Sequence, residues 1–149
     1  MADVRLDSLI SYARCFVGTP YRWGGNGPAG FDCSGLACAI LRKAGVVRVS
    51  EDLTAQEIYA RILFQKGTQF DPKREGFPVG TFLFYGETVS KISHVAFMVD
   101  AYSVLEAGGG DHTTTSVERA IEQRAFVRET HISFRGDMVA AILPRYWLP

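Results

Sequence analysis

Residues 18–36 read GTPYRWGGNGPAGFDCSGL, and this stretch decides how the chain folds around one cysteine. Residues 18–32 contain five glycines and two prolines, a composition typical of a loop. Apolar residues then recur at helical spacing from Cys33 to Ala44, and Gly45 closes the segment, which predicts a helix that begins at the cysteine. Because a helix N-terminus carries partial positive charge, this position favours a reactive thiolate.

The composition is that of a globular chain without charge bias. Of its 149 residues, 47% are hydrophobic and 21% are charged, and 16 basic residues balance 16 acidic ones. This balance gives no electrostatic reason to expect a nucleic acid or an anionic membrane as partner. The three cysteines lack the paired spacing of a disulfide framework. No repeat or linker divides the chain, so we predict a single domain over residues 1–149.

Helical and strand patterns are segregated along the chain. Beside the helix over 33–44, we predict one from Leu6 that ends before Gly18 and one that starts at Thr54, where Thr54 and Glu57 form a capping box. A short helical turn and five strands follow, over residues 116–123 and over 79–85, 94–99, 103–107, 125–129 and 138–143. Helices followed by strands predict an α+β fold with N-terminal helices packed on a central antiparallel sheet.

Two other kinds of site are not supported by the motifs. Residues 25–30 match the dinucleotide pattern G-x-G-x-x-G, but no alternating strand and helix pattern surrounds them, and Pro20 and Pro28 interrupt the neighbourhood. The cysteines and histidines lack the spacing of zinc motifs such as C-x-x-C or H-E-x-x-H. We therefore predict neither a metal nor a cofactor.

A histidine that would complete a site with Cys33 stands in Ser93-His94-Val95, at the head of a predicted strand. A cysteine and a distant histidine are the minimum for nucleophilic acyl transfer. Together with the blocks 21–25 (YRWGG) and 32–36 (DCSGL), these residues resemble the NlpC/P60 cell-wall cysteine peptidases, a papain-like group of peptidoglycan endopeptidases. The resemblance implies their papain-like α+β fold. Thr81 does not match the family's sequence pattern, because family members often carry an aspartate at this position.

The resemblance implies a role for each matching residue. Cys33 would be the nucleophile, and His94 would hold its proton and then protonate the leaving amine. The hydroxyl of Tyr21 would help to form the oxyanion hole. Three further residues would bind the substrate: Asp32, Ser34 and Trp23. For Asp32 the role of helix cap is an equal expectation, and Trp23 is either a wall of the cleft or a packing residue.

Two residues are candidates for the third polar group, which would orient the imidazole. Glu106 lies twelve residues after His94, where the family usually has a polar residue. Strand alternation turns Glu106 away from the side of Leu105, and an inward carboxylate requires a partner. We favour Glu106, with His112 as the alternative. The glycine-rich segment 106–115 is expected to be either a mobile loop over the cleft or a plain hairpin connection.

By resemblance, the chain would hydrolyse peptidoglycan stem peptides between D-γ-glutamate and a diamino acid. The alternatives are N-acetylmuramoyl-L-alanine amidase or acyl-transferase chemistry with the same Cys33 and His94, and a catalytically silent structural or binding module. The first residues do not form a secretory signal, and no apolar run approaches a membrane span. We therefore expect synthesis in the cytoplasm and action on the wall after lysis or delivery. Residues 125–144 resemble compact bacteriophage members, which implies an endolysin or a virion-associated hydrolase, with a phage particle or secretion apparatus as partner.

Overall fold

Three helices precede the main strands of the sheet, in the order that the sequence predicts. The computed structural model describes residues 2–146, and within them the chain forms four α-helices, six strands and one 3-10 turn. The helices are α1 (Ala2–Arg14), α2 (Cys33–Lys43), α3 (Ala55–Phe64) and α4 (Val117–Gln123). The strands are β1 (Thr68–Phe70), β2 (Phe82–Gly86), β3 (Ile92–Met98), β4 (Ser103–Gly108), β5 (Phe126–His131) and β6 (Met138–Leu143), with η1 (Ile132–Phe134) before β6.

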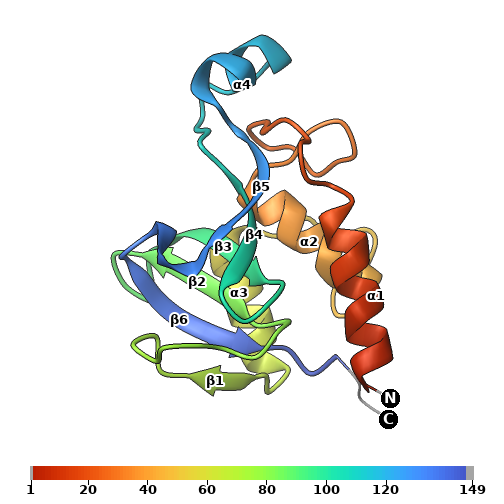
Figure 1. Cartoon of the computed structure of the whole chain (residues 1–149), viewed down its shortest axis with the longest axis vertical. Helices are drawn as coiled ribbons and strands as arrows, with labels where there is room; N and C mark the ends of the chain where they lie inside the picture. Colours follow the sequence, from red (N-terminus) through yellow and green to blue (C-terminus); the bar gives the residue numbers. More distant parts are fainter. Residues whose placement is uncertain (1, 147–149) are drawn as a thin grey trace.

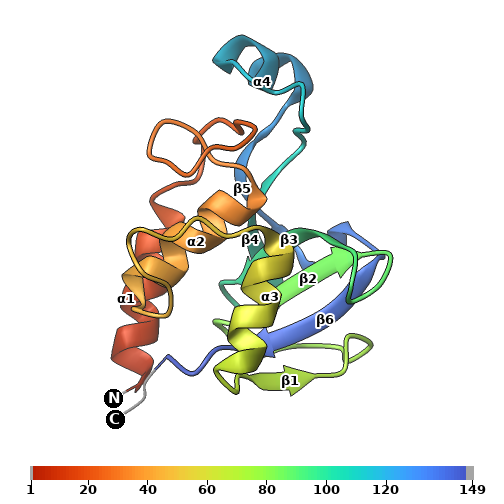
Figure 2. The same ribbon diagram turned by 180° about the vertical axis from the view of Figure 1, so that it is seen from behind.

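The described strands form one antiparallel sheet in the order β1-β6-β2-β3-β4-β5. Helices α1, α2 and α3 lie together on one face of this sheet (Figure 2). The β4 and β5 ends extend beyond the body as an arm that carries α4 (Figure 1). The expectation of an α+β fold with N-terminal helices on an antiparallel sheet is thereby confirmed.

Strand alternation gives the sheet a hydrophobic cluster on each face. On the helical face, Phe84, Phe97 and Leu105 are buried with the apolar sides of the helices. On the opposite face, Tyr85 and Met98 belong to a smaller cluster that also includes residues from the segment before β2. Because side chains alternate along a strand, neighbouring positions serve different faces. His94 and Glu106 follow the second face, as the neighbours Tyr85 and Phe134 of the His94 ring show.

The structure corrects some predicted boundaries. The strand predicted from residue 79 begins only at Phe82, because Val79 and Gly80 form a turn in which Gly80 has φ +91°. The Thr81 hydroxyl donates to the Pro78 carbonyl at 2.6 Å, which holds this turn together. The first helix ends at Arg14, earlier than its apolar pattern indicates. The edge strand β1 was missed because it has three residues, two of them exposed.

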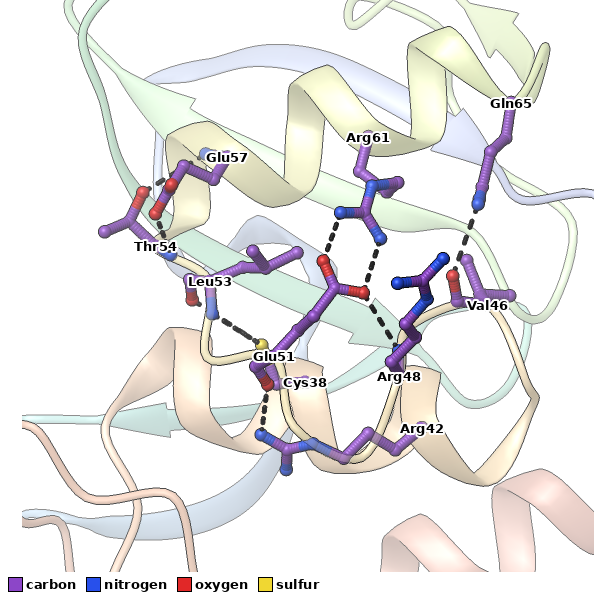
Figure 3. Close-up of polar contacts among 10 residues, drawn as sticks. All are labelled: Cys38, Arg42, Val46, Arg48, Glu51, Leu53, Thr54, Glu57, Arg61 and Gln65. Atoms are coloured by element: carbon purple, nitrogen blue, oxygen red, sulfur yellow. Dashed lines mark hydrogen bonds and ion pairs between the residues drawn. The ribbon is translucent and has the colours of Figure 1, made fainter.

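The connection between α2 and α3 is held by a polar network (Figure 3). Its centre is Glu51, whose carboxylate accepts hydrogen bonds from the Arg61 guanidinium and from the Arg48 backbone N–H. The Glu51 carbonyl accepts from Arg42 of α2 at 2.8 Å. At the start of α3 the predicted capping box of Thr54 is confirmed. The network therefore ties both helices to one loop, and α2 carries the cysteine at its other end.

Candidate active site

Cys33 is the first residue of α2, as predicted, and Asp32 caps the helix. The Asp32 carboxylate accepts hydrogen bonds from the backbone N–H of Gly35 at 2.6 Å and of Gly24 at 3.1 Å, and from the Ser34 hydroxyl at 3.2 Å. Burial raises the pKa of Asp32, and these hydrogen bonds oppose that shift. The cap thus ties the glycine-rich loop to the first turn of the helix that presents the cysteine.

Glycine is required where the loop meets this first turn. A Cβ at Gly35 would overlap the carbonyl oxygen of Gly25, so any side chain there would push the loop away. The Gly25 carbonyl itself accepts from the Asp32 backbone N–H at 3.0 Å. These contacts set the position of Cys33, which is partly exposed as a free thiol. Gly35 of the block DCSGL is therefore required by the close packing of the loop against α2.

His94 lies between Cys33 and Glu106. Its Nε2 is 2.7 Å from Oε1 of Glu106, and its side chain also hydrogen-bonds Cys33. The Cys33 sulfur is 3.9 Å from the carbonyl oxygen of Ser93, so the thiol lies beside the start of β3. Because Nε2 is engaged by a carboxylate acceptor, it carries a proton, and the other ring nitrogen is left for the thiol. The structure thus brings together three residues from α2, β3 and β4.

The electrostatics of this group favour a charged histidine. Burial lowers the pKa of His94, but the hydrogen bonds with Cys33 and Glu106 outweigh it and raise the pKa to about 9. Burial raises the pKa of Glu106, whereas its contacts with His94 and Arg128 lower it, and the net direction is down. An imidazolium therefore faces a carboxylate at neutral pH. A cation beside a thiol is the environment of reactive cysteines.

Arg128 is the residue that the sequence analysis missed. It is the direct cross-strand neighbour of Glu106 in the β4–β5 pair, and its Nε donates to Oε2 of Glu106 at 2.6 Å. Gly108 makes room for the same carboxylate, since a Cβ there would lie 2.6 Å from Cδ of Glu106. The sequence does show an acidic and a basic residue on successive predicted strands. It does not show the register that sets Arg128 opposite Glu106.

Tyr21 lines the same cleft as Cys33 and is buried. Its ring packs against Gly110, where a Cβ would come within 2.6 Å of Cε1. Burial raises the pKa of Tyr21, and the nearby Cys33 and Asp32 raise it further, so the hydroxyl keeps its proton. A neutral phenol next to the sulfur is suited to donate a hydrogen bond.

These side chains line an open cleft of about 490 Å³. Trp23 is among the residues that line this cleft, with 55% of its surface exposed, and its role in binding the substrate stays a prediction. The Trp23 ring lies 6.2 Å from the ring of His112. The residue whose side chain meets His94 Nε2 is Glu106, not His112. The segment 106–115 is not a loop throughout, because residues 106–108 belong to β4.

Asp32 and Ser34 are placed differently. Both take part in the cap of α2, and neither is among the described residues that line the cleft, so substrate binding by these two stays a prediction. Among the side chains that the structure describes, those of residues 6–146, no three His, Cys, Asp or Glu are grouped so that they could hold a metal ion. In the same part of the chain, every helix is too short or too polar to cross a membrane.

A cysteine at a helix N-terminus that faces a histidine on an antiparallel sheet is the arrangement of the papain-like α+β fold. The model of the NlpC/P60 family matches residues 18–131. The chain therefore belongs to the NlpC/P60 family.

Known proteins of this family differ in what their names say they do. Over 107 residues the chain is 33% identical to the probable peptidoglycan endopeptidase LytE of Bacillus subtilis, a match to 71% of this chain and 28% of LytE. It is 33% identical over 141 residues to dipeptidyl-peptidase 6 of Lysinibacillus sphaericus, covering 91% of this chain and 42% of that protein. The solved structure of RipD from Mycobacterium tuberculosis, described as a non-catalytic NlpC/p60 domain adapted to peptidoglycan binding, matches with a TM-score of 0.63 at 18% identity. That match covers 95% of this chain and 97% of RipD. The chain thus spans less than half of both sequence relatives.

Proposed function

We propose that the chain is a peptidoglycan hydrolase that cleaves stem peptides as a cysteine endopeptidase. The observation that carries the proposal is the line of Cys33, His94 and Glu106 in an open cleft, with a 2.7 Å contact between the last two. The names of LytE and dipeptidyl-peptidase 6 support a peptide bond as the target. Nucleophile, proton carrier and orienting group are the three parts that acyl transfer by a thiol needs.

In the proposed mechanism each residue carries out one step. The Cys33 sulfur attacks the scissile carbonyl carbon, and the Tyr21 hydroxyl donates to the oxygen that becomes negative. The protonated His94 then gives its proton to the leaving amine as the C–N bond breaks, which leaves an acyl-enzyme. A water molecule that loses its proton to His94 hydrolyses this thioester and restores the thiolate and imidazolium. Such positioned proton transfer contributes about 10²–10⁴-fold to the rate.

The bond between D-γ-glutamate and a diamino acid is the specific target that we propose, on the strength of the family resemblance. An amidase would use the same Cys33 and His94 but cut between the glycan and the first stem residue. The fragments therefore differ: the endopeptidase frees the amine of a diamino acid, whereas the amidase frees the amine of L-alanine. The expected phage origin and delivery to the wall stay predictions.

A silent binding module is the remaining alternative, and RipD is an example by its description. A module without turnover has no need for a cysteine, a protonated histidine and a buried carboxylate in contact. In this chain Glu106 is 2% exposed, and keeping a buried charge requires partners. His94 and Arg128 supply those partners, which favours an active enzyme.

The test is mass analysis of purified peptidoglycan after digestion. Wild type and Cys33→Ala are compared, with Cys15→Ala as the matched control because Cys15 is an exposed thiol outside the cleft. Stem-peptide fragments cut at one bond by wild type and Cys15→Ala, and absent with Cys33→Ala, are the expected result. Release of intact stems with a free L-alanine amine would identify an amidase instead. Binding to the wall without any fragment would identify a silent module.

A further inference from the structure

Arg128 closes a chain of three charged side chains on three neighbouring strands. His94 is on β3, Glu106 on β4 and Arg128 on β5, in the order in which the sheet pairs these strands. The two oxygens of the Glu106 carboxylate are divided between them: Oε1 meets His94 at 2.7 Å and Oε2 meets Arg128 at 2.6 Å. Each oxygen is therefore held by a different partner, and the carboxylate cannot rotate without breaking one of the contacts.

Glu106 and Arg128 differ in exposure to solvent, and this difference determines which of the two charges needs a partner. The Glu106 side chain is 2% exposed, whereas the Arg128 side chain is 45% exposed, and both residues line the cleft. A buried carboxylate is costly unless it is paired and hydrogen-bonded. An arginine with its outer side in water remains charged throughout the accessible pH range. Arg128 thus holds a positive charge against a carboxylate that is almost completely buried.

The reaction makes this permanent charge useful, an argument that rests on the proposed thiol mechanism. His94 is a cation before it protonates the leaving amine and is neutral immediately afterwards. In the neutral state Glu106 would lose its charged partner on β3 and would tend to take up a proton. Arg128 keeps a positive charge on Oε2 in both states. The carboxylate can then orient the neutral imidazole for the attack of water and stabilise the imidazolium that follows.

We propose that Arg128 is a positioning residue, which keeps the Glu106 carboxylate ionised and aligned with His94 while the histidine gives up and regains its proton. Other ionisable groups also face Glu106 and His94, and their protonation contributes to the pH profile of the site. They are Cys33 from α2, Tyr85 from β2, and Arg135 and Asp137 from the segment before β6.

The test is a double-mutant cycle on peptidoglycan hydrolysis with Arg128→Gln, Glu106→Gln and the double variant. Arg128→Gln should lower kcat by about 10–100-fold, the range known for outer partners that orient metal-binding histidines, with little change in KM. In the Glu106→Gln background the same substitution should change kcat by less than about twofold. Arg128→Lys should recover part of the loss because the positive charge remains. The matched control is Arg14→Gln, which removes an ion pair with Glu129 of β5 outside the cleft and should leave kcat unchanged.

A second measurement tests the role of Arg128 without any peptidoglycan substrate. Iodoacetamide alkylation of Cys33 is followed against pH by peptide mass spectrometry, which distinguishes Cys33 from the other cysteines. In Arg128→Gln the acid limb of this profile should move to higher pH, because Glu106 then protonates more easily. The limb should not move when Arg128→Gln is added to Glu106→Gln. This readout remains valid even if wild type releases no wall fragment, an outcome that would refute the proposed function alone.

Three results would overturn the positioning role. Equal losses of kcat from Arg128→Gln with and without Glu106 would show that Arg128 does not act through the carboxylate. A rise in KM alone would make Arg128 a substrate-binding residue. An unmoved acid limb together with a lowered thermal midpoint would show that Arg128 only stabilises the β4–β5 pair.

Discussion

Gly108→Ala tests whether the site depends on the space around one carboxylate. Gly108 lies two residues after Glu106 on β4, and a Cβ at Gly108 would lie 2.6 Å from the Glu106 carboxyl carbon. Carbon atoms in contact are about 3.5–4.0 Å apart, so the carboxyl group must withdraw by about 1 Å. The 2.7 Å contact between Glu106 and His94 would lengthen accordingly. At roughly 3.7 Å it would no longer be a hydrogen bond.

The expected loss follows from this displacement. A misplacement of about 1 Å in a catalytic group can cost about 10²-fold, so kcat/KM of Gly108→Ala should fall by about this factor. Overpacking should lower the free energy of unfolding by only about 1–3 kcal/mol, so the protein stays folded. Release of wall fragments measures the first quantity and urea denaturation the second.

Gly76→Ala is the matched control for this variant. A Cβ at Gly76 would have open space around it, and the residue lies outside the cleft. Both variants add one methyl group, so only the contact with Glu106 separates them. Wild-type kcat/KM in a folded Gly108→Ala protein would refute the reasoning, because the carboxylate would then have no role that depends on its place.

Three further predictions use other parts of the molecule. Tyr21→Phe should lower kcat by about 10²–10³-fold with little effect on KM, as expected for an oxyanion-hole donor, and unchanged kcat would count against that role. The rate should fall as the pH rises through about 9, where His94 loses its proton, and Glu106→Gln should move this alkaline limb to lower pH. A pH titration by NMR of the His94 ring checks the same value directly, and titration near the ordinary 6.5 would contradict it. Thr54→Ala should lower the free energy of unfolding by about 0.5–2 kcal/mol through loss of the α3 cap, measured by urea denaturation, and should not change kcat.

The features predicted well from the sequence are those with local causes. The start of α2 at Cys33 follows from a glycine-rich loop, a capping aspartate and an apolar helical period, all within about twenty residues. The box at Thr54 likewise depends on residues of one turn. Glu106 was favoured over His112 because the family resemblance has a polar residue twelve positions after the histidine, and because an inward carboxylate needs a partner; the structure places it beside His94. For α2 and for the box at Thr54, a short stretch contains the whole physical reason, whereas Glu106 meets His94 across two strands.

The features that were missed depend on pairing across the sheet. Arg128 is a site residue only because β4 and β5 pair in the register that sets it opposite Glu106. The sequence shows both strands but does not show which residues face each other. The late start of β2 has a similar origin, since the turn at Gly80 is held by bonds to Pro78 and across to Met98. Propensity alone favours a strand through these residues.

The same alternation of side chains along β4 directs apolar residues into the core and Glu106 into the site. Leu105 and Ala107 flank Glu106, and both are fully buried in the cluster on the helical face. A slip of one residue in β4 would turn the carboxylate toward that apolar cluster and bring Leu105 toward His94. Such a slip is prevented by the cost of exposing the apolar pair and of burying an unpaired charge. The register that buries the core therefore also sets Glu106 between His94 and Arg128.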